Sequence, residues 1–417
     1  MIPLGLDDVA RLCAGRLHRA REAREVTGVQ IDSRRICAGD LFVAVGRGSA
    51  FVEDALERGA AAALVPDDAH RALGALAGEV RSRSRAQVVG ITGSTGKTST
   101  KDLLAAVCSR QRATVAAEAS YNNELGVPLT LCRLEPDTEV CIVELAMRGA
   151  GQIAQLCSFA RPEVGIVTNV GPAHLELVGT VEDVVRAKSE LVEALPPAGT
   201  AVVPEGFPVG RTDIEVVRVG EPDARIVDGR TAVRIGDQEV ELAFTARYQA
   251  RNALTALHAA GALGIPLDRG PIDVAFSPWR GEEIDLPGGG LLVNDAYNAN
   301  PISMRAALED LVDRADGRRT VAVLGDMAEL GAEGPRYHRE IGRLIRELGI
   351  DAVFATGPLS EAYADSAPIV WWSGEHDLDA LADAVQAELR PGDCVLVKGS
   401  RAAGLEAVAD RLAGVLH

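Results

Sequence analysis

The sequence predicts an α/β protein of three domains, at residues 1–85, 86–279 and 280–417. A chain of 417 residues is too long for one ordinary hydrophobic core. From residue 86 onward, short apolar runs alternate with amphipathic helical segments, which is typical of a mostly parallel sheet with helices on its faces. Turn-forming residues separate the units: Arg81–Arg85 is expected to be a linker, and Ser277–Gly281 with Pro287–Gly290 a hinge.

Composition excludes several classes of function. The net charge of −17 argues against nucleic acid or an anionic membrane as a partner. No apolar run is long enough for a membrane span, and Asp7 and Asp8 stand where a signal peptide would be apolar. The seven cysteines are scattered without a CxxC pair, as in a reducing compartment. We therefore expect a cytoplasmic protein, and a monomer.

The first domain contains short β-like runs at residues 26–31, 40–45 and 61–65, separated by Gly and Asp turns. Asp32, Ser33 and Arg34 directly follow the first of these runs. Arg34 there is suited to binding an anion, but a plain strand-end turn with a solvated arginine explains the same pattern equally well.

The second domain begins with the run VVGITGSTGKTSTK, in which an apolar strand (residues 88–92) leads into a glycine turn and then a helix from Lys97. Backbone N–H groups and the positive helix end of such a turn hold a phosphate, Lys97 adds a charge, and the Thr98 hydroxyl reaches Mg²⁺. The spacing departs from the common pattern, because Ile91 occupies its first glycine position. A tight strand-to-helix turn is the alternative.

Further strands are expected at residues 140–145, 164–170 and 201–203. Glu144 ends the first of these and His174 follows the second, so both lie where ligands gather on a parallel sheet. Glu144 is suited to a nucleotide-bound Mg²⁺, an ordinary strand-end charge being the alternative. His174 alone indicates little, since a lone histidine is more often structural. Residues 224–244 are typical of an antiparallel edge or hairpin, before a helix at residues 252–263.

Lysine is rare in this chain, where 39 of the 43 basic residues are arginine. The four lysines are therefore candidates for places where a guanidinium would fail. Lys188 falls within the apolar stripe of a helix capped by Thr180 and Asp183. Burial favours its neutral amine, which can react with CO₂ to give a carbamate that binds metal. A lysine that extends its amine to the surface is the alternative. Lys101 is expected on an exposed helix face, without a role.

The third domain has expected strands at residues 291–296, 320–324, 352–355, 369–372 and 394–397. Polar clusters follow the first and the last. Asp295 is suited to ribose hydroxyls and Arg280, at the hinge, to a nucleotide phosphate, while Lys398 and Arg401 offer two cations to a carboxylate. In the second domain, Asn122 and Asn123 precede an apolar helix, where they either bind a sugar, phosphate or peptide or cap the helix.

The motifs GITGSTGKTSTK, SYNNELGVPLTL, NVGPAHLELVG, RAKSEL, ARYQARNALTA, NDAYNANP, GDMAELG and KGSR occur in an order that resembles the Mur ligase family. The resemblance covers most of the chain. It implies an N-terminal UDP-sugar substrate domain, a central P-loop ATPase and a C-terminal Rossmann-like domain. It also implies ATP and Mg²⁺ as cofactors.

The resemblance assigns the ATP phosphates to Thr92, Gly93, Ser94, Thr95, Gly96, Lys97 and Thr98. It assigns one Mg²⁺ to Thr98 and Glu144, a second to His174 and carbamylated Lys188, adenine to Asn252, and the phosphates and ribose to Arg280 and Asp295. It assigns the UDP-sugar to Asp32, Ser33 and Arg34, the sugar–peptide part to Asn122 and Asn123, a further substrate contact to Arg148, and the incoming peptides to Lys398 and Arg401. Lys97, Lys188 and His174 are then the expected catalytic residues.

The implied reaction is ATP-dependent addition of D-alanyl-D-alanine to UDP-N-acetylmuramoyl-tripeptide through an acyl phosphate, a step of peptidoglycan synthesis. Two rivals stay open. One is a ligase of the same family that adds lysine, diaminopimelate or glutamate. The other is a nucleotide-binding relative without activity.

Overall fold

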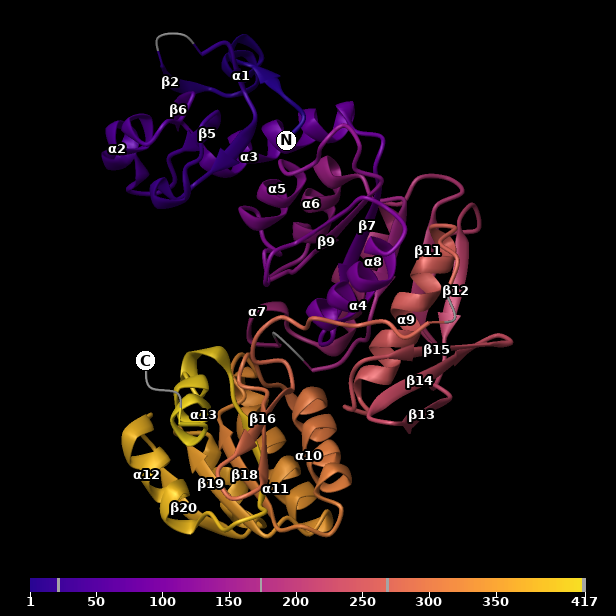
Figure 1. The fold of residues 1–417 in the computed structure, drawn as a ribbon, viewed down its shortest axis with the longest axis vertical. Coiled ribbons are helices and arrows are strands. Elements are labelled where there is room, and N and C mark those ends of the chain that lie inside the picture. Colours follow the sequence, from indigo (N-terminus) through magenta and orange to yellow (C-terminus); the bar gives the residue numbers. More distant parts are fainter. Residues whose placement is uncertain (21–22, 173–174, 268–269, 415–417) are drawn as a thin grey trace.

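The computed structural model describes residues 1–20, 23–172, 175–267 and 270–414. The chain forms three α/β units, with the central one between the N-terminal unit and the C-terminal unit (Figure 1). The expected fold class is confirmed. No helix in the described part of the chain is both long and apolar enough for a membrane span.

The N-terminal unit is built on a four-stranded sheet in the order β2-β6-β5-β4, in which β2 alone runs antiparallel to its neighbour. Its elements are β1 (Leu4–Gly5), α1 (Leu6–Leu12), β2 (Gly15–Arg19), β3 (Glu25–Val26), β4 (Gly28–Gln30), β5 (Asp40–Val43), α2 (Val52–Glu57), β6 (Ala62–Pro66) and α3 (Ala69–Arg83). The three expected strand regions are present.

Helix α3 corrects the expected linker. It continues to Arg83, and Arg81 is buried, with Nη2 donating to Glu163 Oε1 at 2.5 Å. The apolar side of α3 packs on α5 and α6, so one hydrophobic core runs from the N-terminal unit into the central one. Alternating Arg and Ser resembles a linker in composition, but here the arginine is paired across an interface.

The central unit contains a six-stranded parallel sheet in the order β12-β11-β10-β7-β9-β8. Its strands are β7 (Gln87–Thr92), β8 (Thr114–Ala116), β9 (Val140–Glu144), β10 (Val164–Val167), β11 (Thr200–Pro204) and β12 (Glu215–Val219). Val88 packs with α6 and α8 on one face, whereas Val89 packs with α4 and α9 on the other. Because helices cover both faces of the sheet, its inner strands β7, β9, β10 and β11 are mostly apolar.

The helices of this unit are α4 (Lys97–Ser109), α5 (Gly126–Leu131), α6 (Gln152–Ala160), α7 (Leu175–Val178), α8 (Val181–Glu193) and α9 (Gln249–Ala262). The expected hairpin is a three-stranded antiparallel sheet of β13 (Ala224–Val227), β14 (Arg230–Ile235) and β15 (Gln238–Leu242). Helix α8 has the expected cap: Thr180 Oγ1 accepts from the Asp183 N–H, and Asp183 accepts from the Thr180 N–H.

The C-terminal unit has a sheet in the order β16-β17-β21-β18-β19-β20, parallel except for β16. Its elements are β16 (Glu282–Leu286), β17 (Gly290–Asn294), α10 (Pro301–Ala315), β18 (Thr320–Gly325), α11 (Gly334–Glu347), β19 (Ala352–Thr356), β20 (Ile369–Ser373), α12 (Leu378–Glu388), β21 (Cys394–Lys398) and α13 (Glu406–Leu412). All five expected strands are present. The expected hinge at Pro287–Gly290 is wrong, because residues 287–289 form the turn of the β16–β17 hairpin and Gly290 begins β17.

Candidate functional site

The phosphate loop joins β7 to α4, and both of its glycines are required by geometry. Gly93 has φ +153°, and a Cβ there would lie 1.8 Å from Thr168 Oγ1. Gly96 has φ +77°, and a Cβ there would lie 2.4 Å from Asn252 Oδ1. Residues with φ above zero favour glycine. The loop is therefore packed closely between β10 and α9, with the N-terminus of α4 at its end.

Asn169 holds this loop from the end of β10. Its Oδ1 accepts from the Thr95 N–H at 2.9 Å, and its backbone carbonyl accepts from the Ser94 N–H at 3.1 Å. The sequence analysis missed this residue, although it lies in the NVG motif at the carboxyl end of the strand expected at residues 164–170. In this structure Asn169 thus occupies two N–H groups that the loop would otherwise offer to an anion.

Thr98 and Glu144 meet at the carboxyl ends of β7 and β9. Thr98 Oγ1 donates to Glu144 Oε2 at 3.2 Å and accepts from Arg280 Nη2 at 2.9 Å. Glu144 is fully buried, and its Oε1 has no hydrogen-bond partner in the described part of the chain. Burial raises the pKa of Glu144, against the opposing charges of nearby lysines and Arg280. A buried, partly unsatisfied carboxylate beside a hydroxyl is a costly arrangement without a ligand.

These two side chains fit Mg²⁺ bound to a nucleotide. Among the described residues, no three His, Cys, Asp or Glu side chains form a metal-binding group. Nucleotide-bound Mg²⁺ does not need one, since it takes one or two protein oxygens and completes its shell with phosphates and water. The unpartnered Oε1 of Glu144 and the neighbouring Thr98 hydroxyl supply such oxygens.

Lys97 and Lys188 face the same region from two helices. Lys97 Nζ donates to the Gly93 carbonyl at 2.7 Å, and burial lowers its pKa to about 8. Lys188 is 2% exposed on α8, as its place in the apolar stripe predicted, and the surface-reaching alternative is wrong. Burial first, and then the charge of Lys97, lower the pKa of Lys188 well below its ordinary value.

Lys188 makes no hydrogen bond or ion pair with another residue that the structure describes. Among the described residues, its buried amine therefore has no acceptor that would stabilise a positive charge. The expected companion, His174, lies outside the described residues.

Lys101 corrects an expectation, because it is buried and not on an exposed face. Its Nζ donates to the carbonyls of Ala117 and Ala119, at 2.9 and 3.0 Å, and lies 4.0 Å from Glu144 Oε1. Lys101 is four residues after Lys97, so the two lie on one helical face that points toward Glu144. This four-residue spacing is the sequence feature that could have predicted Lys101 on the same side of the helix as Lys97.

The C-terminal unit contributes a second group of side chains. The Arg280 guanidinium lies over the Tyr297 ring, 3.8 Å from its centroid, while donating to Thr98. Asp295 is paired with Lys398, whose buried ammonium lies 2.5 Å from Asp295 Oδ2. Arg401 is exposed and stacks over Trp279, 4.5 Å from its centroid. Arg280 thus reaches the phosphate-loop helix, whereas Lys398 and Asp295 neutralise each other.

Asn252, on α9, lies against Gly96 of the phosphate loop and donates to Gln249 Oε1 at 2.7 Å. Gln249 in turn donates to Ser99 Oγ on α4 at 3.2 Å. Helix α9 therefore brings Asn252 to the same region as the phosphate loop, although the two are far apart in the sequence.

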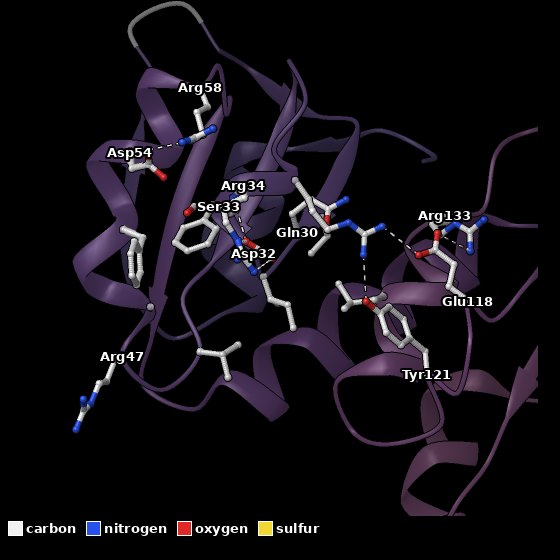
Figure 2. Close-up of a pocket in the computed structure, with 18 residues that line it drawn as sticks. Gln30, Asp32, Ser33, Arg34, Arg47, Asp54, Arg58, Glu118, Tyr121 and Arg133 are labelled. Atoms are coloured by element: carbon white, nitrogen blue, oxygen red, sulfur yellow. Dashed lines mark hydrogen bonds and ion pairs between the residues drawn. The ribbon is translucent and has the colours of Figure 1, made fainter. Parts of the chain in front are cut away.

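A separate pocket of 1020 Å³ lies between the N-terminal and central units. Figure 2 shows it with Asp32, Ser33 and Arg34 on one side and Glu118 and Tyr121 on the other. Its lining includes five arginines and three carboxylates, so it is positive within an acidic protein: Arg34, Arg35, Arg47, Arg58 and Arg133 against Asp32, Asp54 and Glu118. Such a pocket is suited to an anionic ligand.

Within the pocket, Arg34 is already paired with Asp32. Nη2 of Arg34 lies 2.7 Å from Asp32 Oδ2, and hydrogen bonds from Arg34 lower the pKa of Asp32 to about 2. Ser33 is buried in the wall. The structure therefore brings the three predicted residues together at a pocket, where Asp32 also accepts from the Arg34 N–H as in a turn.

The other expected substrate residues lie apart from this pocket's lining. Asn123 Oδ1 accepts from the N–H groups of Leu125 and Gly126, at 3.2 and 2.9 Å, so its side chain holds the turn that leads into α5. The Asn122 carbonyl accepts from the Ala146 N–H at 2.9 Å. Arg148 is exposed, and its N–H donates to Gln152 Oε1.

Comparison with known families gives two matches. Residues 91–260 match the Mur ligase middle domain. Residues 279–401 match the glutamate ligase domain of Mur ligases. Together these regions contain the phosphate loop, Glu144, Lys188, Arg280 and Lys398.

Individual relatives cover nearly the whole chain. A UDP-N-acetylmuramoyl-tripeptide–D-alanyl-D-alanine ligase of Synechocystis sp. is 34% identical, over 93% of this chain and 92% of the relative. The enzyme of that name from Escherichia coli is 33% identical, over 98% of each chain. A crystal structure of MurF from Acinetobacter baumannii superposes with a TM-score of 0.85 at 26% identity, covering 99% of both chains.

A MurF ligase from Thermotoga maritima, solved in complex with ADP, superposes with a TM-score of 0.81 at 28% identity, over 93% of this chain and 97% of that one. Sequence identity above 30% over nearly the full length agrees with the matched domains and with the shared fold. The chain belongs to the Mur ligase family, among the UDP-N-acetylmuramoyl-tripeptide–D-alanyl-D-alanine ligases.

Proposed function

We propose that this chain joins D-alanyl-D-alanine to UDP-N-acetylmuramoyl-tripeptide at the expense of ATP. The γ-phosphoryl group moves to the terminal carboxylate of the tripeptide, giving an acyl phosphate and ADP. The amine of D-alanyl-D-alanine then attacks the acyl carbon, an amide forms, and phosphate leaves. The first step replaces a poor leaving group with a good one.

One observation carries this proposal: the buried Thr98–Glu144 pair lies at a phosphate loop, with the ammonium of Lys97 and the amine of Lys188 directed to the same region. The first turn of α4 offers backbone N–H groups to the nucleotide phosphates. Lys97 is held half-buried at the loop, where its charge stabilises the negative charge that spreads over the transferred group. Asn252 and Arg280 approach the loop from α9 and the domain junction.

Mg²⁺, when bound, neutralises phosphate charge, and Thr98 and Glu144 would hold it. Lys188 has the properties that a carbamate needs: a neutral amine, burial and no competing partner among the described residues. The amine nitrogen attacks CO₂, a C–N bond forms, and a proton is released. The carboxylate so formed, with His174, would serve a second Mg²⁺.

The pocket between the first two units is proposed to take the UDP part of the substrate, with Asp32, Ser33 and Arg34 in its wall. Asn122, Asn123 and Arg148 are proposed for the sugar–peptide part, and Lys398 and Arg401 for the incoming peptides. Binding at Lys398 requires its ion pair with Asp295 to open. We assign residues 1–85, 86–279 and 280–417 to three domains acting together.

We place this activity in cytoplasmic peptidoglycan precursor synthesis, and so in maintenance of cell shape and cell division, by a monomeric enzyme. The tripeptide's third residue is lysine or diaminopimelate. Parallel turnover assays with the two tripeptides decide between them.

Phosphate release with D-alanyl-D-alanine tests the reaction directly. We expect release that depends on ATP, the muramoyl tripeptide and the dipeptide together. Release with free lysine, diaminopimelate or glutamate would instead support a different ligase of the family. ATP binding without ADP formation from any muramoyl peptide would overturn the enzymatic proposal.

The carbamate has its own test in Lys188→Ala. This variant should lose ligation, and short-chain carboxylates should partly restore it. Wild-type protein incubated with isotope-labelled CO₂ should show a carbamate carbon signal that the variant lacks. Glu182→Ala, an exposed change on the same helix, should behave as wild type. Full activity of unrescued Lys188→Ala would refute the role.

A further inference from the structure

Residues 117–121 form a segment that contacts side chains of all three units. On its inner side lies Lys101 of α4. The Lys101 ammonium is enclosed by two carbonyls of the segment, by Asp102 Oδ1 at 2.9 Å and by Ser277 Oγ at 3.4 Å. Its nearest contact toward the proposed metal ligands is Glu144 Oε1, at 4.0 Å.

Lys101 also supports an unusual backbone conformation. Ala119 has φ +44°, in the left-handed region that residues other than glycine rarely adopt. Its carbonyl is one of the two that accept from Lys101 Nζ. Backbone strain of this kind persists only where neighbouring contacts hold it. The path of the segment therefore depends on Lys101.

The outer side of the segment faces the pocket of the N-terminal unit. Glu118 Oε2 and the Tyr121 hydroxyl each accept from Arg35, both at 3.1 Å. All three side chains line the pocket (Figure 2, where Glu118 and Tyr121 are labelled). A ligand that enters the pocket therefore touches the residues on either side of Ala119 and Ser120.

A third contact leads to the C-terminal unit. The Ser120 and Tyr297 hydroxyls are hydrogen-bonded to each other. The Tyr297 ring lies under Arg280, whose guanidinium donates to Thr98 Oγ1. The segment thus reaches the Thr98–Glu144 pair by two routes, through Lys101 to Glu144 and through Tyr297 and Arg280 to Thr98.

We propose that Lys101 is a positioning residue that couples ligand binding in the N-terminal pocket to the Thr98–Glu144 pair, through residues 117–121. This inference rests on the proposed function, in which that pocket takes the UDP part of the substrate. Occupancy of the pocket fixes Glu118 and Tyr121, the segment fixes the Lys101 ammonium, and the ammonium fixes the carboxylate of Glu144.

A lysine suits this position better than an arginine. Its compact ammonium has three rotatable donors, and here it meets acceptors in several directions within 3.4 Å. The flat, larger guanidinium directs its donors within one plane. In a chain with 39 arginines and four lysines, this geometry accounts for a lysine here.

The test measures coupling between the two ligands. The dissociation constant of a non-hydrolysable ATP analogue is determined with and without saturating UDP-N-acetylmuramoyl-tripeptide, and the ratio of the two values is the coupling factor. We expect a factor of about tenfold in the wild type. Lys101→Met, which matches the length of lysine without its charge, should lower the factor toward one, because only the route through Tyr297 and Arg280 then remains.

Two further variants keep the test independent of folding at a buried site. Arg35→Met and Ser120→Ala alter partly exposed side chains, and both should lower the factor. Arg58→Met is the matched control: Arg58 lines the same pocket but pairs with Asp54, away from the segment. Its coupling factor should equal that of the wild type. A weaker affinity for the muramoyl tripeptide does not by itself change the ratio, because the second ATP-analogue constant is measured at saturating tripeptide.

The outcomes separate the inference from the proposed function. A wild type that binds no muramoyl peptide and releases no phosphate with D-alanyl-D-alanine would overturn the proposed function. An active wild type with a factor of one would overturn the coupling. The coupling would also be overturned if Lys101→Met had the same coupling factor as the wild type. If Lys101→Met does not fold, the same conclusion follows when Arg35→Met and Ser120→Ala both keep the wild-type factor.

Discussion

Replacement of Arg314 by methionine should strongly destabilise the C-terminal unit. Arg314 lies on α10 with its side chain only 8% exposed. Its guanidinium pairs with Asp310 Oδ2 at 2.5 Å and with Glu283 Oε1 at 2.7 Å. These two carboxylates also bind the central unit, because Glu283 accepts from the Thr245 hydroxyl and Asp310 from the Arg247 N–H.

The size of the effect follows from the carboxylate that is left behind. Asp310 is 4% exposed at its side chain, and burial raises its pKa even in the intact pair. Removing one member of a buried pair costs about 3–5 kcal/mol. The loss of stability cannot exceed the free energy of protonating the Asp310 carboxyl that is left without its partner. From the ordinary pKa of an aspartate, this free energy is about 5 kcal/mol at a pH of about 7.5 and about 2 kcal/mol at a pH of about 5.5.

The same reasoning predicts the pH dependence. In the variant, the pKa of folded Asp310 lies above its unfolded value, so folding takes up a proton. The penalty is therefore full above the folded pKa and fades as pH falls toward the unfolded pKa. The difference in the free energy of unfolding between the variant and the wild type should therefore become smaller at acid pH.

The assay is denaturant unfolding followed by tryptophan fluorescence. All three tryptophans report on the third domain or its junction: Trp279, Trp371 and Trp372. Arg305→Met is the matched control, because Arg305 makes an i,i+4 pair with Glu309 on the same helix but is 54% exposed. An exposed pair of this kind contributes about 0.5 kcal/mol or less. Equal shifts for the two variants, or a pH-independent gap between them, would refute the reasoning.

Three further predictions concern the phosphate loop, the end of β9 and helix α11. Gly93→Ala places a methyl group against Thr168 and should weaken ADP binding by at least about tenfold, corresponding to strain of about 1–3 kcal/mol; calorimetry showing unchanged affinity would contradict this. Glu144→Gln should lower turnover by at least about a hundredfold, since a bound metal stabilises the charge of the transition state by several kcal/mol. Near-normal phosphate release in this variant would show that Glu144 is not needed as a metal ligand. Burial lowers the pKa of His338, and its neutral Nε2 accepts from the Met327 N–H. The stability of the fold should therefore fall as pH drops below about 6.5, the unfolded-state pKa of histidine. Melting temperatures measured across this pH range should fall less in His338→Gln than in the wild type.

Local patterns predicted much of the fold and part of the site. The 3.6-residue period placed Lys188 within an apolar stripe, and the helix is buried on that side. The glycine turn was recognised despite its shortened spacing, because the apolar run, the two glycines and the Lys97–Thr98 pair follow one another directly in the sequence. Such features depend on residues near one another in the sequence, so the sequence displays them.

Contacts between distant segments were not predictable in the same way. Lys101 was expected to be exposed because its helix was judged alone, whereas α9 and β8 cover α4 in the fold. The contacts of Arg35 with Glu118 and of Ser120 with Tyr297 join different units and carry no local pattern. The Pro287–Gly290 error differs, since a glycine-rich turn between two strand-like runs is itself a hairpin signal.

The four lysines together indicate why arginine was not used at these positions. Lys97, Lys101 and Lys398 each donate to backbone carbonyls in confined spaces, which suits a compact ammonium. Lys188 has no acceptor among the described residues, and its pKa is lowered by burial. Arginine remains protonated in proteins, so it would place an unpaired charge in that core. The requirement at Lys188 is therefore for an amine that can lose its proton, which is also the requirement for reaction with CO₂.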